Sequence, residues 1–175
     1  MRIGMLLVLF MGSAVNVWGG NTGNAVQVQV RSEKGQIFPL YPVASQFPSR
    51  KLYVEAVKGD HYTILVRNLL DRRVGIVLAV DGRNIISGKK SWLRNDERMY
   101  VLGPYEQGEF KGWRTSLHSI NRFYFTDVAD SYAAAFGDES AMGVIAVAVY
   151  PEVRRREEPA DLSQELFRSD RRAAP

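Results

Sequence analysis

Residues 72–88 read RRVGIVLAVDGRNIISG, and this stretch decides the fold. Apolar side chains recur there at every second position, which places them on one face of a β-strand: Val74, Ile76, Leu78 and Val80. The residues between them are small or apolar as well, so we predict a strand covered on both faces, in the middle of a sheet. Asp81-Gly82 follows at once and suits a type I′ turn, which predicts an antiparallel return through residues 84–86.

A second long apolar strand is predicted over residues 140–150. One face carries Ile145, Val147 and Val149, and the other carries Val144 and two alanines. Small residues on the second face repeat the pattern of residues 74–80, so we expect both strands in central positions.

Shorter alternating segments with turn residues between them surround these two strands. They cover residues 26–30, 52–57, 62–66, 98–102, 109–113 and 120–126. We expect Phe110 and Trp113 to face opposite ways, and Phe123 and Phe125 to face inward. Prolines cannot donate to a ladder, so residues 36–47 are predicted to form an extended edge or packed loop. Asp130 or Ser131 is expected to cap one short helix that runs to Ala135.

Strands at this spacing predict an all-β fold, an immunoglobulin-like or related antiparallel β-sandwich, over residues 25–150. The chain has 175 residues and no cysteine, so disulfides, thiol catalysis and cysteine-based metal sites are excluded. A domain of this size buries enough surface to fold without disulfides. Residues 151–175 carry balanced charges and few apolar side chains, which favours a flexible tail over a short helix.

The N-terminus has the pattern of a secretory leader. Arg2 precedes an apolar run over residues 3–11, and small residues around Gly19 and Gly20 suit cleavage there. The strong part of the run is shorter than the roughly 20 residues of a bilayer span. We therefore expect residues 1–20 to be a signal peptide and the protein to be periplasmic or secreted. A membrane anchor or a buried segment are the alternatives.

Reactive groups are sparse. Residues 82–91 lack the glycine spacing and the following helix of a phosphate loop. His61 and His118 are the only histidines, and neither has a second metal ligand at a suitable spacing. A hydrolase using His118 with Ser116 or Ser119 is a minor alternative. Asp127, Asp130, Asp138 and Glu139 are a weak calcium candidate because they lack an EF-hand spacing. We expect no cofactor, no bound metal and no catalytic residue.

Exposed aromatics are the most suggestive feature for binding. Trp92, Trp113 and Tyr105 fall on predicted loops, turns or outward faces, where they would offer a contact surface for a protein or a glycan. Packing against the rest of the sheet is the alternative. The small net charge of +4 and the clusters 89–90 and 154–156 are typical of solvated faces, so we expect no nucleic-acid partner.

Several segments together resemble a domain of exported bacterial proteins that has no assigned activity. The similarity covers about residues 52–150 and includes YTILVRN from Tyr62, the stretch from Val74 to Gly88, and RFYFT from Arg122. It implies a bacterial envelope setting and a β-sandwich, and it transfers no site. The resulting hypothesis is a non-enzymatic binding or structural module in the envelope, with a carbohydrate-binding module as the sharper alternative.

Overall fold

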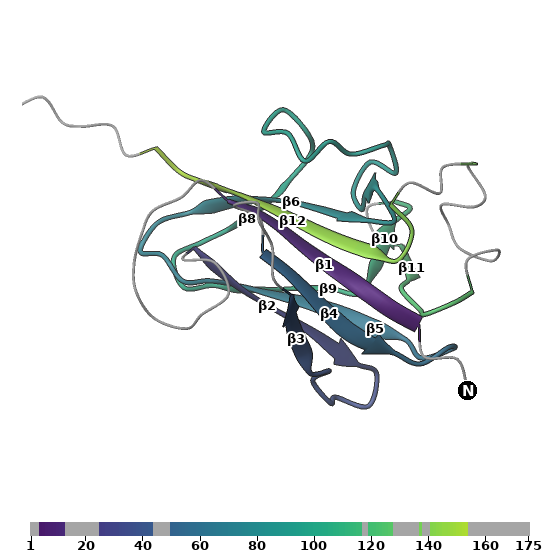
Figure 1. Ribbon diagram of the computed structural model, residues 1–175. Helices are drawn as coiled ribbons and strands as arrows, with labels where there is room; N and C mark the ends of the chain where they lie inside the picture. The colour runs from purple at the N-terminus through teal and green to yellow at the C-terminus, as the bar shows by residue number, and fades with distance from the viewer. Residues whose placement is uncertain are drawn as a thin grey trace, which may run out of the picture.

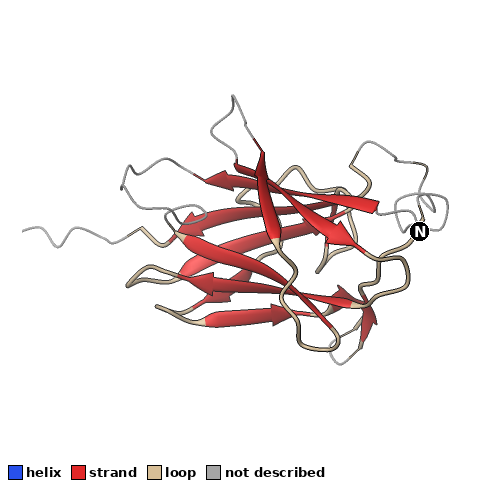
Figure 2. Ribbon diagram, turned by 60° about the horizontal axis from the view of Figure 1, so that its bottom comes forward, coloured by secondary structure: helices blue, strands red, loops and turns tan. Residues whose placement is uncertain are grey.

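The computed structural model describes residues 4–12, 25–43, 50–116, 119–127, 137 and 141–153. These residues form twelve strands: β1 (Gly4–Gly12), β2 (Val26–Ser32), β3 (Leu40–Val43), β4 (Arg50–Ala56), β5 (Tyr62–Asn68), β6 (Val74–Val80), β7 (Arg83–Asn84), β8 (Tyr100–Leu102), β9 (Gln107–Phe110), β10 (Gly112–Arg114), β11 (Ile120–Arg122) and β12 (Val144–Pro151). Among the described residues, Figure 2 shows strands and loops only. No described segment forms a helix that is long and apolar enough to cross a membrane.

The central hairpin has the predicted form. Alternating apolar residues make β6, and Asp81 and Gly82 both adopt positive φ, at 49° and 72°. β7 then returns antiparallel, with Val80 opposite Arg83 and Ala79 opposite Asn84. Two consecutive positive φ angles give the type I′ turn whose twist matches that of the flanking strands. The return is shorter than expected, because the ladder ends at Asn84.

The large sheet has the order β3-β4-β1-β12-β6-β7, with β8 pairing the first half of β6. The two long apolar strands, β6 and β12, are antiparallel neighbours with Leu78 opposite Val147. Residues on both of their faces are buried, including Val77 and Ala148 on the outer face. Their predicted central placement is confirmed. β3, which contains Pro42, lies at the edge as expected for a strand with a missing donor.

A second sheet, β2-β5-β9, faces the first and completes the sandwich (Figure 1). The core lies between the two layers, where alternate residues of both sheets are buried: Val28, Val30, Ile64 and Val66 from the small sheet, and Val54, Ile76, Leu78, Ile145 and Val147 from the large one. Period-two alternation in the sequence therefore becomes two inner faces that exclude water. The predicted all-β sandwich is confirmed.

Aromatic residues close one end of this core. Tyr62 stacks on Phe125 with ring centroids 4.4 Å apart, and Trp113 meets Phe123 edge-to-face at 5.9 Å. Phe123 and Phe125 face inward as predicted, while Tyr124 between them is exposed.

The expectation of one strand over residues 109–113 is wrong. β9 ends at Phe110 and β10 begins at Gly112, where the chain leaves β5 to pair with β11. The change of direction at Lys111 puts both Phe110 and Trp113 in the core, instead of on opposite faces. The predicted helix of residues 130–135 and the tail from residue 154 onward lie outside the described residues.

Candidate functional site

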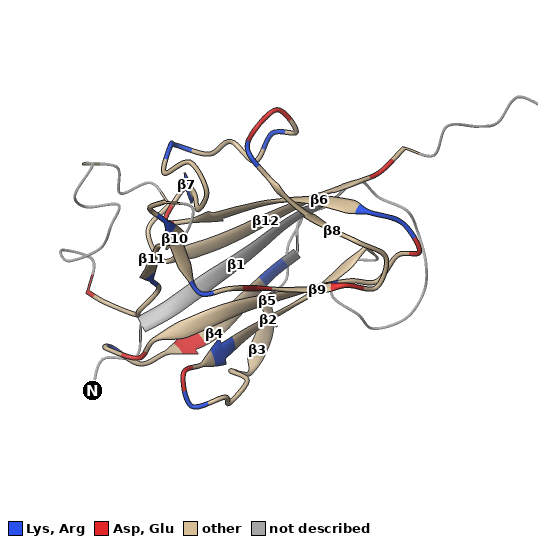
Figure 3. Cartoon of the chain, turned by 180° about the vertical axis from the view of Figure 1, so that it is seen from behind, with Lys and Arg blue, Asp and Glu red and all other residues tan. Residues whose placement is uncertain are grey.

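The connection between β7 and β8 contains a loop of residues 90–98, which we call the Trp92 loop. Figure 3 shows the connection between these strands standing out from the large sheet, with acidic residues between basic ones. Trp92 is exposed over 70% of its surface, more than the other large aromatic residues described. Packing in the core does not account for a tryptophan whose indole is exposed to water. This loop is therefore the strongest candidate for a contact site.

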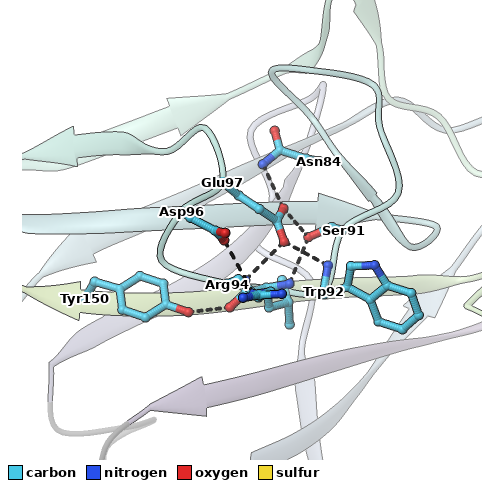
Figure 4. A network of polar contacts seen from close by, with 8 residues as sticks. Asn84, Ser91, Trp92, Arg94, Asp96, Glu97 and Tyr150 are labelled. Atoms are coloured by element: carbon cyan, nitrogen blue, oxygen red, sulfur yellow. Dashed lines mark hydrogen bonds and ion pairs between the residues drawn. The ribbon is translucent and has the colours of Figure 1, made fainter.

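The Glu97 carboxylate organises the Trp92 loop (Figure 4). One oxygen, Oε1, accepts the backbone N–H of Trp92 at 2.8 Å and that of Arg94 at 3.0 Å. The other, Oε2, accepts the Ser91 hydroxyl at 2.7 Å and the Asn84 amide at 3.3 Å. A single side chain thus binds both ends of a tight turn, and the backbone on each side of the indole is fixed.

These hydrogen bonds determine the ionisation of Glu97. Burial alone would raise the pKa of this carboxyl, but the groups that donate to it together hold its pKa below the ordinary value. Arg94 contributes most among the donors, followed by Ser91, Trp92 and Asn84. Glu97 is therefore charged at neutral pH, and its hydrogen bonds are of the stronger, charge-assisted kind.

Asn84 anchors the base of the loop. Its side chain is buried and donates to the Arg98 carbonyl at 2.7 Å, while its own oxygen accepts the Ile86 and Ser87 N–H groups. Asparagine supplies two donors and an acceptor at one point, as a buried turn of this kind requires. The connection from β7 therefore begins from a fixed position.

Leu93 has a φ of 57°, in the left-handed region that non-glycine residues seldom adopt. The Ser91 hydroxyl accepts the Leu93 N–H at 3.1 Å, and the Tyr150 hydroxyl from β12 donates to the Leu93 carbonyl. Burial, together with the nearby Glu97 and Asp96 charges, raises the pKa of Tyr150, so this phenol remains a neutral donor. A left-handed backbone at a non-glycine residue costs about 1–3 kcal/mol, so it persists only where the surrounding contacts impose it. Such strained residues are concentrated at functional sites.

The outer face of β6 makes room for the loop. A Cβ at Gly75 would stand 2.3 Å from Met99 Sδ, directly after the Trp92 loop. The absence of a Cβ at Gly75 leaves space that the Met99 side chain fills. On the loop itself, Lys90 Nζ lies 5.1 Å from the centroid of the Trp92 ring, within the range of a cation–π contact.

The three predicted contact residues do not form one surface. Trp113 is only 8% exposed and packs in the core against Phe123, so the prediction that it is a contact residue is wrong. Tyr105 is 61% exposed, in the turn between β8 and β9. Its N–H donates to Leu70, which precedes β6, whereas Ser91 donates to Gly82, which follows it. Tyr105 and the start of the Trp92 loop are therefore anchored beyond opposite ends of β6.

The structure does not strengthen the remaining candidates for a catalytic or metal site. His61 lies with Nδ1 3.1 Å from the Phe123 carbonyl and its ring beside Tyr124. Lys58 and Asp127 form an exposed ion pair. His118 and the acidic positions 130, 138 and 139 lie outside the described residues. Within the described part of the chain, no group of three His, Asp or Glu side chains is arranged to hold a metal ion.

Sequence reasoning found Trp92 but missed the residues that fix it. Glu97 and Asn84 look like ordinary loop residues in the sequence, and only the polar run from Ser91 to Glu97 indicated a structured turn.

Comparisons with protein-family models, with curated proteins and with solved structures give no match for this chain. The Trp92 loop is therefore the basis on which a function can be argued.

Proposed function

We propose that the protein is a non-enzymatic, exported β-sandwich that binds a partner in the bacterial envelope through the Trp92 loop. The observation that carries the proposal is an indole 70% exposed on a loop that one charged carboxylate holds through four hydrogen bonds, two of them from backbone N–H groups. Binding costs less entropy when the contact residue is already held in place. Tryptophan is also among the residues that most often dominate binding energy at interfaces.

The chemistry of the loop supports binding over catalysis. Its groups are an aromatic face, the Lys90 ammonium, and the Arg94–Asp96 ion pair at 3.5 Å. Each of the four hydrogen bonds to Glu97 comes from a donor that positions the loop, so this carboxylate has a structural role.

The proposal of export rests on the leader pattern of residues 1–20 and on the resemblance to exported bacterial proteins.

The test is a comparison of three proteins as bait in a cross-linking capture from bacterial envelope extract: wild type, Trp92→Ala and Tyr124→Ala. Tyr124 is also an exposed aromatic, at 49%, but lies away from the loop beside His61. We expect one partner that wild type and Tyr124→Ala both capture and that Trp92→Ala loses. Equal capture by all three proteins would contradict a role for the loop.

A carbohydrate-binding module is the second candidate, favoured by the same exposed indole beside Lys90. It now depends on Trp92, with Tyr105 as a separate position, because Trp113 is buried. Titration with peptidoglycan fragments and cell-surface polysaccharides, followed by tryptophan fluorescence, is the direct measurement. Saturable quenching in wild type, with glycan binding to Trp92→Ala lost when it is measured by calorimetry, would support this candidate over a protein partner.

A further inference from the structure

Strand β1 occupies an internal position in the large sheet, between β4 and β12 (Figure 1). It runs antiparallel to β4, with Leu6 opposite Val54, and parallel to β12, with Phe10 opposite Val147. Residues 4–11 of this strand also belong to the apolar run of the expected leader. One segment therefore serves as a strand of this sheet and carries the pattern of a segment that is removed on export.

Removal of residues 1–20 would leave a gap the width of one strand. β4 and β12 would then lie two strand spacings apart, about 9–10 Å, each with one unpaired edge. Residues of both strands beside the gap are fully buried on the inner face, among them Val54, Ile145 and Val147. Close-packed interiors do not retain empty volumes of this size, and unpaired backbone groups away from water are costly.

Direct pairing of β4 with β12 would fill the gap only in part. β4 pairs with residues Gly4 to Phe10 of β1, whereas β12 pairs with residues Leu7 to Gly12 of β1. The two strands therefore overlap only along Leu7 to Phe10, and pairing them without sliding leaves the end of each strand without a partner. An added strand of about the length of β1 satisfies both edges along their whole length.

We propose that the gap between β4 and β12 is a strand-acceptor site, which binds an extended, uncharged apolar segment of a partner protein after residues 1–20 are removed. This inference rests on the export in the proposed function. The backbone ladders on both sides supply affinity, and the apolar inner face selects the side chains, as in other cases of strand addition. The bound segment runs parallel to β12, because β1 does so.

The first experiment uses the whole chain, produced without export so that residues 1–20 are retained, with a specific protease site placed within residues 13–24. After cleavage, the nicked protein is incubated with excess fluorescent peptide that carries the sequence of residues 3–12 and two added lysines for solubility. We expect one labelled peptide to bind per protein. A peptide with Leu7→Pro and Val8→Pro should bind at least tenfold more weakly, because prolines lack the N–H donors that a ladder needs.

Cysteine cross-linking then fixes the register, since the chain has no cysteine of its own. A peptide with Leu7→Cys should form a mixed disulfide with Tyr53→Cys, its partner in the β1–β4 ladder. Val57→Cys, just beyond β4, is the matched control and should not react. Failure of the nicked protein to take up peptide, or equal reaction with both cysteines, would overturn the proposal.

The competing outcome is closure of the sheet. Lys51 and Ala146 both pair with Leu9, so they lie across β1 from each other. At two strand spacings, a disulfide between Lys51→Cys and Ala146→Cys is too long to form, whereas direct pairing of β4 with β12 brings it within reach. Rapid disulfide formation after leader displacement would contradict an acceptor site. The intact mass of exported protein tests leader removal separately, so a failed export proposal is distinguishable from a failed acceptor site.

Discussion

The Glu97 carboxylate accepts the backbone N–H of Trp92 at 2.8 Å, so an acidic residue five positions along the chain fixes the most exposed indole described. Glu97→Gln keeps the shape of the side chain but removes its charge and one acceptor. We expect the loop to loosen and the free energy of unfolding to fall by about 1 kcal/mol, a small value because water screens the site. Trypsin cleavage after exposed Arg94 should become several-fold faster.

Glu55 provides the matched control for this variant. It is an exposed glutamate on β4, remote from the loop. Glu55→Gln should leave the rate of cleavage after Arg94 unchanged. Equal cleavage rates in wild type and Glu97→Gln would show that the carboxylate does not hold the loop.

The contribution of Glu97 should depend on pH. Its pKa in the folded protein lies below the ordinary 4.5, because its hydrogen bonds outweigh the effect of burial. A carboxyl group whose pKa is lower in the folded state than in the unfolded state stabilises the folded state. This contribution is complete above the unfolded-state pKa and is lost as the pH falls through the folded-state pKa. The difference in melting temperature between wild type and Glu97→Gln should therefore be greatest near pH 7 and shrink toward pH 3. A difference that is constant over this range would contradict the assignment.

Trp92 and Trp113 should respond to alanine substitution in opposite ways. Trp113 packs in the core against Phe123, so Trp113→Ala should cost about 3–5 kcal/mol of unfolding free energy. Trp92→Ala removes an exposed side chain and should change stability by about 0.5 kcal/mol or less, while partner capture is lost. Chemical denaturation of both variants measures the contrast. A large loss of stability in Trp92→Ala would mean that the indole has a packing role.

The sequence was sufficient for the long strands β6 and β12, because period-two alternation is a local property. The type I′ turn was equally local, since Asp81-Gly82 carries its own conformational preference. The position of Trp113 was not predictable in this way. The chain changes direction at Lys111 to pair β10 with β11, and this event depends on contacts with residues 120–122 that no local pattern reports.

The candidate site shows the same division. Trp92 was predicted on a polar loop from composition alone, and it is exposed there. Glu97 was not selected, because its role arises from four donors that converge only after the loop has folded. Similarly, the sequence showed Gly75 only as part of a small outer face, and the structure shows that the Met99 side chain fills the space beside it.

Asp81 offers a stabilising substitution. Its carboxylate accepts the Gly143 N–H at 2.8 Å, and partial burial raises its pKa despite this hydrogen bond. Because the pKa of Asp81 is higher in the folded state than in the unfolded state, its ionisation lowers the free energy of unfolding at high pH. This cost disappears as the pH falls below the unfolded-state pKa. Asp81→Asn removes the charge, keeps an acceptor and tolerates the positive φ of 49°. We expect a slightly higher melting temperature at pH 7 and no gain at pH 3; destabilisation at pH 7 would contradict this account.

Gly112 should be the glycine least tolerant of substitution among those with a normal φ. A Cβ at this position would stand 2.1 Å from the Asn121 carbonyl oxygen and 2.9 Å from the Arg122 Cα, both backbone atoms of β11. Backbone cannot move aside as a flexible side chain does, so Gly112→Ala must separate β10 from β11. We expect a loss of about 2–4 kcal/mol, comparable to other severe steric changes in a core.

Substitution of Gly35 measures the cost of a left-handed backbone in the absence of a steric conflict. It has a φ of +86°, and a Cβ there would meet no atom within 4 Å. Gly35→Ala should therefore cost only about 1 kcal/mol, the penalty of a left-handed conformation for alanine. Denaturant unfolding of both variants, with Trp113 fluorescence as the probe, compares the two effects directly. If Gly112→Ala were no more destabilising than Gly35→Ala, the close approach of β11 to Gly112 would not constrain the fold.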